Sequence, residues 1–178
     1  YADRPDGDIP HSAACLIWPV TDFAIARNLF ASHQNRNCQI KASAELDFIN
    51  NVVYQWGKLT GGNSNAFDLP NSAGTPGAKV DFIANEYING PQTNPTAAYN
   101  VFAQSTPRPG GQFYIQGNVG AYRPTPTGSE YSIVTGIPSA FMMATRIVNA
   151  IPTATVMPVF TAKAYVLANA GSRPWGRN

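Results

Sequence analysis

Charged side chains are scarce in this sequence of 178 residues. Asp, Glu, Lys and Arg together make up 12% of it, about half of the usual quarter. Asn, Thr, Ser, Gln, Pro and Gly fill many of the positions that charged residues would otherwise hold. A large uncharged surface is typical of secreted or assembled proteins and argues against an ordinary cytosolic enzyme. The composition therefore predicts a secreted or cell-surface, extracytoplasmic protein.

Excess positive charge and long apolar runs are also lacking. The net charge is +2, too small to supply the phosphate contacts that dominate nucleic-acid binding. No run of 18 apolar residues is present, so we expect no membrane span. The first residue is Tyr1 rather than Met, which would fit either the loss of a leader or an artificial start of the chain.

Groups that do chemistry are few. The chain has two His and ten acidic residues, and it lacks phosphate-binding glycine loops, nucleophile elbows and zinc-binding helices. A nucleophilic pair of Cys15 and His33 would compete with a disulfide. Asp3, Asp6 and Asp8 lack the spacing of a calcium loop. We therefore expect no enzyme activity, no cofactor and no metal site.

Only two cysteines are present. Cys15 and Cys38 form an even pair, do not follow the CxxC spacing of redox motifs, and lie in a chain of extracellular composition. A structural disulfide is the favoured interpretation over a reactive thiol.

The residues that are present show two kinds of periodicity. From 154 to 170 every even position is apolar, which predicts a long C-terminal strand. A helix is expected before it, at 139–151, since Ser139 can cap the helix and Pro152 would end it. Residues 46–59 are ambiguous: Leu46, Ile49 and Val53 follow helical spacing, yet β-branched and aromatic residues are frequent. A helix at 44–56 is favoured.

Other segments complete the expected fold. Strands are predicted at 79–88, 112–122 and 131–137, a further helix at 94–104, and no internal repeat is evident. We therefore expect one β-rich α+β domain over 1–178, with a sandwich-like antiparallel sheet and two to four short helices on one face. An extended arm at about 1–14 and a tail at about 171–178 would flank it.

The two ends suggest assembly with other copies of the chain. The arm is acidic and the tail is basic with an isolated Trp, so head-to-tail contact could build a fibre, pilus or shell. The candidate subunit contacts lie in the arm, the last strand and the tail: Asp3, Asp6, Asp8, Phe160, Ala162, Ala164, Val166, Arg173, Trp175 and Arg177.

The alternative is a secreted carbohydrate-binding or adhesive module that recognises surface glycans. Tyr and Asn side chains stack on sugars and hydrogen-bond to them. Alternation over 112–122 would place three such residues on one strand face, and the candidate ligand contacts are Tyr114, Asn118 and Tyr122.

Overall fold

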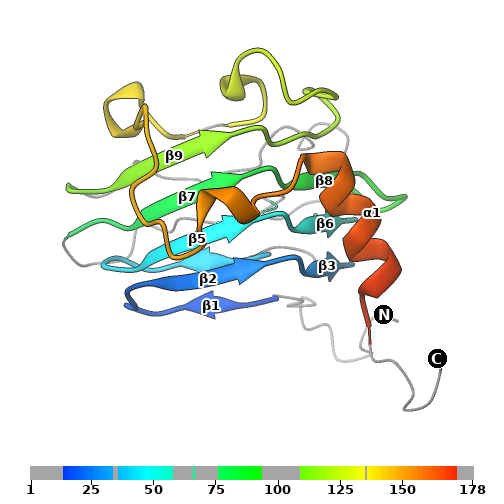
Figure 1. Ribbon diagram of the computed structural model, residues 1–178, viewed down its shortest axis with the longest axis horizontal. Helices are drawn as coiled ribbons and strands as arrows, with labels where there is room; N and C mark the ends of the chain where they lie inside the picture. The colour runs from blue at the N-terminus through cyan, green and yellow to red at the C-terminus, as the bar shows by residue number, and fades with distance from the viewer. Residues whose placement is uncertain are drawn as a thin grey trace, which may run out of the picture.

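A computed structural model describes residues 14–33, 36–57, 66, 76–93, 109–134 and 136–171. Within these ranges the chain is built mostly of short strands, stacked in Figure 1 from β1 and β2 at the bottom to β9 at the top. The elements are β1 (Leu16–Ile17), β2 (Phe23–Ala26), β3 (Leu29–Ala31), β4 (Gln39–Ile40), β5 (Glu45–Ile49), β6 (Val52–Tyr54), β7 (Lys79–Ile83), β8 (Glu86–Ile88), β9 (Gln112–Gln116) and α1 (Val159–Asn169), with 3₁₀ turns at Glu130–Ser132, Ser139–Phe141 and Thr153–Thr155.

The strands form three parallel sheets, in the orders β1-β4, β2-β5-β7-β9 and β3-β6-β8. The chain winds in coils, here called rungs, and the strands of each rung pair in parallel with the equivalent strands of the rung before it. β1, β2 and β3 make the first described rung, and β4, β5 and β6 make the second. The described residues therefore form a parallel β-helix.

The expected antiparallel, sandwich-like sheet is wrong, because every pairing between named strands is parallel. The expected layer of two to four helices is also wrong, since α1 is the one α-helix among the described elements. Strands in successive rungs pair after a full coil of chain rather than through hairpins. Alternation of apolar and polar residues indicates that a segment is a strand, but it does not indicate whether the neighbouring strand is parallel or antiparallel.

An internal repeat, which the sequence reading missed, sets where the strands end. In each rung a residue with positive φ is followed by Asn: Arg27-Asn28, Asn50-Asn51, Ala84-Asn85 and Gly117-Asn118. The left-handed residue turns the chain sharply from one sheet into the next. The strand predicted at 79–88 is accordingly split into β7 and β8, and the one predicted at 112–122 ends at Gln116.

The four asparagines stack into a ladder that satisfies the backbone at these turns. The backbone N of Asn28 donates to Asn51 Oδ1 at 2.9 Å, Asn51 N to Asn85 Oδ1 at 2.9 Å, and Asn85 N to Asn118 Oδ1 at 3.0 Å. Asn51, Asn85 and Asn118 are buried. Because buried backbone groups need partners, the amides replace the sheet hydrogen bonds that the turns interrupt.

Inward-facing side chains stack in the same way and form the core. Phe48 in β5 lies beside Phe82 in β7, with ring centroids 5.9 Å apart, and Phe30 of the first rung stacks on Phe48 at 5.8 Å. Leu46 and Val80 are fully buried one step away. The segment expected as a helix at 44–56 is therefore β5 and β6, whose residues pack between neighbouring rungs.

The C-terminal part differs most from expectation. The strand predicted over 154–170 is a 3₁₀ turn and the helix α1, and the helix predicted at 139–151 is irregular apart from Ser139–Phe141. The described residues of the segment 131–137 form no strand, and a 3₁₀ turn covers the start of this segment. The helix expected at 94–104 lies outside the described residues. Figure 1 shows α1 running alongside β3, β6 and β8, across the rungs.

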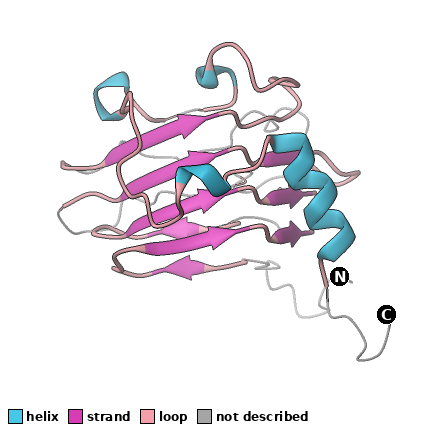
Figure 2. Ribbon diagram, in the orientation of Figure 1, coloured by secondary structure: helices cyan, strands magenta, loops and turns pink. Residues whose placement is uncertain are grey.

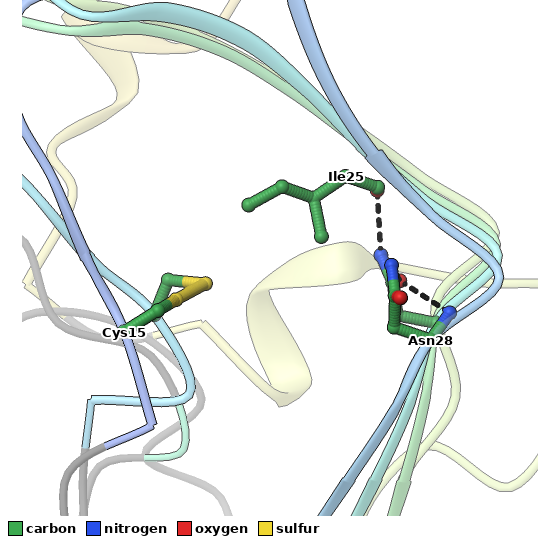
Figure 3. Close-up of a disulfide and its surroundings, with 5 residues drawn as sticks. Cys15, Ile25 and Asn28 are labelled. Atoms are coloured by element: carbon green, nitrogen blue, oxygen red, sulfur yellow. Dashed lines mark hydrogen bonds between the residues drawn. A yellow bond between two sulfur atoms is a disulfide. The ribbon is translucent and has the colours of Figure 1, made fainter. Parts of the chain in front are cut away.

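The predicted disulfide is present and joins the first two rungs. Cys15 and Cys38 precede the paired strands β1 and β4, and their Cα atoms are 4.9 Å apart. Figure 3 shows this bond together with the first members of the asparagine ladder. The bond therefore ties together neighbouring positions of successive rungs.

Candidate functional site, an acidic row on the four-stranded sheet

The outer face of the four-stranded sheet has a row of residues in register. Ala24, Asp47, Asp81 and Tyr114 are paired in turn across β2, β5, β7 and β9. Since residues on a strand alternate between faces, this row points away from the phenylalanine stack. The parallel β-helix therefore places two carboxylates side by side on neighbouring strands, although they are 34 residues apart.

Arg146 lies between the two carboxylates. Its Nη2 donates to Asp47 Oδ2 at 2.9 Å, and its Nε donates to Asp81 Oδ2 at 3.2 Å. The third contact, from Nη1, goes to the hydroxyl of Thr153 at 2.9 Å. Both Asp side chains have no exposed surface. One guanidinium thus offsets the repulsion between two buried anions.

Backbone amides of the following loop complete the coordination of the carboxylates. Ile147 N donates to Asp81 Oδ1 at 3.0 Å, Val148 N to Asp81 Oδ2 at 3.2 Å, and Ile151 N to Asp47 Oδ2 at 2.6 Å. In Figure 2 this loop and its short helix cross in front of the sheet. The two carboxylates therefore hold the 147–151 loop against the outer face of the sheet, in addition to pairing with Arg146.

The cost of burial is visible in Asp47. Desolvation raises the pKa of this carboxyl above its ordinary value, against the opposing effects of the Ile151 amide and Arg146. Its Oδ1 is buried without a hydrogen-bond partner. Burial of this carboxylate therefore costs free energy, and Arg146 stabilises its charged form.

Next to the cluster of Asp47, Asp81 and Arg146, the outer face of the sheet is partly exposed at β9. Tyr114 is half-buried, and its hydroxyl donates to Gln116 Oε1. A hollow of 280 Å³ adjoins this strand, with Gln116, Gly117, Pro126 and Phe160 among its lining residues. Its walls are mostly apolar and its volume is just under the roughly 300–1,000 Å³ of typical ligand pockets.

Of the candidate ligand contacts, the structure places only Tyr114 at this face. Asn118 is buried in the ladder, where its Nδ2 donates to Phe82 O at 3.0 Å. This side chain has no surface to offer a ligand. Tyr122 is 52% exposed but lies in the turn beyond Gly120. The expectation that all three share one strand face is wrong, because the chain turns at Gly117.

The candidate subunit contacts divide into two groups. Those of the arm and tail lie outside the described residues: Asp3, Asp6, Asp8, Arg173, Trp175 and Arg177. The others are on α1, not on a strand. Ala162 and Val166 are buried beneath this helix, whereas Phe160 and Ala164 are exposed. The face expected to bind another copy therefore does not exist in that form.

Asp47, Asp81 and Arg146 escaped the sequence reading, although a signal was present. The segment Leu46-Asp47-Phe48-Ile49 reappears as Val80-Asp81-Phe82-Ile83, and an Asn follows each two residues later. In a solenoid such a repeat places equivalent residues on adjacent rungs. Recognition of the repeat would have paired the two acids. Nothing in the sequence marks Arg146 as their partner.

Comparison with known proteins gives a partial match to one group of relatives. The chain is 39% identical over 87 residues to a protein named "Probable pectate lyase C" from Aspergillus terreus, and equally to one of that name from Aspergillus fumigatus. A third, from Aspergillus flavus, is 34% identical over 88 residues. Each match covers 49% of this chain and 19% of the relative, so the chain spans about a fifth of their length.

No family model matches the chain. No solved structure matches it either.

Two expectations are affected. The relatives bear the name of an enzyme, which weighs against the expectation that this chain is not one, although only a part of each relative is matched. The Cys15–Cys38 disulfide is typical of proteins outside the cytoplasm and supports the predicted extracytoplasmic location. Among the described helices none is long and apolar enough to cross a membrane. The chain is thus a parallel β-helix with partial similarity to probable pectate lyases.

Proposed function

We propose that this chain belongs to a secreted or cell-surface β-helix protein that binds an acidic polysaccharide of the pectate class. The observation that carries the proposal is the open part of the four-stranded sheet at β9. There Gln116 lines a hollow that has Phe160 in its wall, and Tyr114 lies two residues before Gln116 on the same face of β9. The partial similarity to probable pectate lyases supports the choice of an acidic polymer.

The chemistry of the face suits such a ligand. A sugar ring presents apolar C–H patches and hydroxyls, which match Phe160, 51% exposed, and the amide of Gln116. Lys79 lies in the row next to that of Tyr114, and its side chain is 37% exposed while paired with Glu45 at 2.8 Å. This cation is accessible to a uronate carboxylate. Attraction to a polyanion would weaken with added salt.

The proposal is tested by titration calorimetry, which measures the binding of polygalacturonate. A neutral glucan is the comparison ligand. Replacing Tyr114 or Phe160 by Ala should weaken binding by about tenfold, as expected for loss of a stacking contact of ~1–1.5 kcal/mol. Tyr131→Ala is the matched control, since Tyr131 is 49% exposed, lies in a 3₁₀ turn rather than on β9, and does not line the hollow. Equal effects of all three substitutions, or equal affinity for both polymers, would refute the site.

Cleavage is followed in the same samples. A lyase reaction leaves an unsaturated uronide at each break, which absorbs in the ultraviolet. Binding with no absorbance change would make the chain a binding module. An absorbance change that depends on Tyr114 and not on Tyr131 would make it catalytic, and both outcomes retain the polysaccharide as ligand.

A further inference from the structure

Among the described residues, the first rung leaves apolar surface exposed on the side away from the second rung. Four of its large side chains are open to solvent: Leu16 at 42%, Trp18 at 66%, Phe23 at 38% and Leu29 at 37%. Phe23 is paired with the fully buried Leu46 of the next rung, so the side chain of Phe23 lies on the same inner face of the sheet as Leu46. In a solenoid such a surface normally carries a polar cap.

The three strands of this rung carry none of the usual protection against edge pairing. β1, β2 and β3 together contain only Leu, Ile, Phe and Ala. Edge strands are ordinarily protected by Lys, Pro or a bulge. Among the described residues, β2 has β5 on one side and no strand on the other. Its outer edge is therefore open to a further strand.

The opposite end is closed. Met143 N donates to Phe113 O of β9 at 2.8 Å, so a non-repetitive segment already pairs with that edge. Glu130 Oε1 accepts from Gly117 N at 2.6 Å and forms an ion pair of 2.8 Å with Arg123, whose side chain is 4% exposed. These residues end the asparagine ladder. Stacking of the open rung on the closed end of another copy is therefore blocked.

The backbone of β2 shows which groups are free. Arg27 N donates to Ile49 O at 3.2 Å, and Ile25 O accepts from the Asn51 amide at 2.9 Å, so both groups face the second rung. Because successive residues of a strand point their N–H and C=O to opposite sides, Ala24 directs its amide and carbonyl to the open edge. Ala24 is also exposed.

We propose that this rung binds the same rung of a second copy, so that two β-helices join through their open ends. β2 would pair antiparallel with its equivalent about a two-fold axis at Ala24, where each Ala24 exchanges both backbone hydrogen bonds with the other. This register sets the inward-facing Phe23 opposite Ile25 of the second copy. The two cores thereby become continuous across the interface.

The charges beside β2 match this arrangement. Asp22 comes just before the strand and Arg27 just after it, and both are exposed. Antiparallel pairing places the Asp22 end of one copy beside the Arg27 end of the other, twice per dimer. Parallel pairing would instead place like charges together. Opposite charges across paired strands stabilise the pairing, and like charges oppose it.

The dimer differs from the contact expected from the sequence. That expectation used oppositely charged arms, which lie outside the described residues, in a head-to-tail polymer. The present interface is isologous, uses the first rung, and closes at two copies.

A charge-reversal experiment tests the interface with the full chain. Sedimentation equilibrium should show a dimer for the unmodified protein over about 1–200 μM, the range expected of a small interface. Ala24→Glu and Ala24→Lys each place two like charges together at the axis, so each should weaken the dimer by about tenfold or more. An equimolar mixture of the two variants should restore it as a heterodimer.

Ala140→Glu is the matched control, because Ala140 is exposed in a 3₁₀ turn near β9. This variant should dimerise like the unmodified protein. A monomer at every concentration would overturn the proposal and leave other residues of the chain to cover the rung. A dimer that survives both Ala24 substitutions, or a mixture that stays monomeric, would also overturn it.

Discussion

At the scale of single residues, the buried ion cluster joins one Arg to two Asp side chains that have no exposed surface. Asp47 and Asp81 stand at paired positions of adjacent strands, which would be unfavourable for two anions without Arg146. The cluster also holds the loop amides of Ile147 and Ile151. Its role as seen here is to fasten that loop over the sheet.

Removal of Arg146 should therefore be costly and sensitive to pH. Arg146→Gln leaves two buried carboxylates without their cation, and loss of one partner of a buried pair typically costs about 3–5 kcal/mol of unfolding free energy. Arg146 lowers the pKa of Asp47, which burial already raises, so the substitution raises that pKa further. A raised folded-state pKa favours the folded state at low pH and disfavours it as pH rises through that pKa.

Urea unfolding of Arg146→Gln should accordingly show its largest deficit near neutral pH and a smaller deficit as the pH falls towards the ordinary Asp value. Arg36→Gln is the control, since it removes the charge of an exposed Arg that is not part of the ion cluster. It should change the stability by less than about 0.5 kcal/mol at any pH. A deficit that does not vary with pH would show that the charges of the two Asp residues are not its cause.

At the scale of elements, the sequence predicted the presence of strands better than their limits. Both Lys79–Ile83 and Gln112–Gln116 lie within predicted strands. Strand ends in this fold are set by left-handed residues, and two of these, Ala84 after β7 and Arg27 after β2, are not typical turn formers. The ladder of Asn side chains holds these conformations, and it forms only between rungs. Single-segment periodicity therefore could not reveal the ends.

The error at α1 has a different cause. Every even position of residues 158–170 is apolar largely because Ala recurs there, and Ala is also the best helix former. The buried residues of the helix are Val159, Ala162 and Val166, which follow the spacing of 3 and 4 that a helix requires. Ala fits either period. Tertiary contact with β8 was needed to choose between them.

The ladder makes a prediction about these turns. Asn85→Ala removes the acceptor for Asn51 N and the donor to Phe48 O, at 2.9 and 2.8 Å, and leaves both groups buried. We expect it to cost about 2–4 kcal/mol, since a buried group without a partner costs about 1–3 kcal/mol. Asn28→Ala is the control. Asn28 is exposed at the end of the ladder, so its loss should cost under about 1 kcal/mol.

Chemical denaturation of both variants gives the comparison. Equal losses of unfolding free energy in the Asn85 and Asn28 variants would mean that the contribution of each amide does not depend on its burial in the ladder. A loss at Asn85 that a Ser or Asp in its place recovers only in part would identify the amide as the required group. A carboxylate only accepts, and a hydroxyl donates and accepts through one oxygen on a shorter side chain, whereas an amide does so through two separate atoms.

At the scale of the whole molecule, the fold class could not be predicted from composition or from local pattern. A parallel β-helix depends on contacts between residues one coil apart, 23 to 34 positions in this chain. The length of the connecting loops varies, which disguised the repeat. The composition nevertheless predicted a disulfide, and it is this bond that joins the open rung to the rest of the stack.

The position of the disulfide predicts a link between stability and association. Cys15→Ser with Cys38→Ser removes the covalent tie between the first two rungs, which the chain-entropy relation values at about 3 kcal/mol. The first rung has neighbours on one side only among the described residues, so it should open before the others. Hydrogen exchange should speed up in β2 and β3 and remain slow in β7. Because the proposed dimer needs an ordered β2 edge, the same double variant should dimerise more weakly. Unchanged exchange in β2 would show that parallel pairing with β5 alone holds the rung. A dimer of full strength despite faster exchange would place the interface elsewhere.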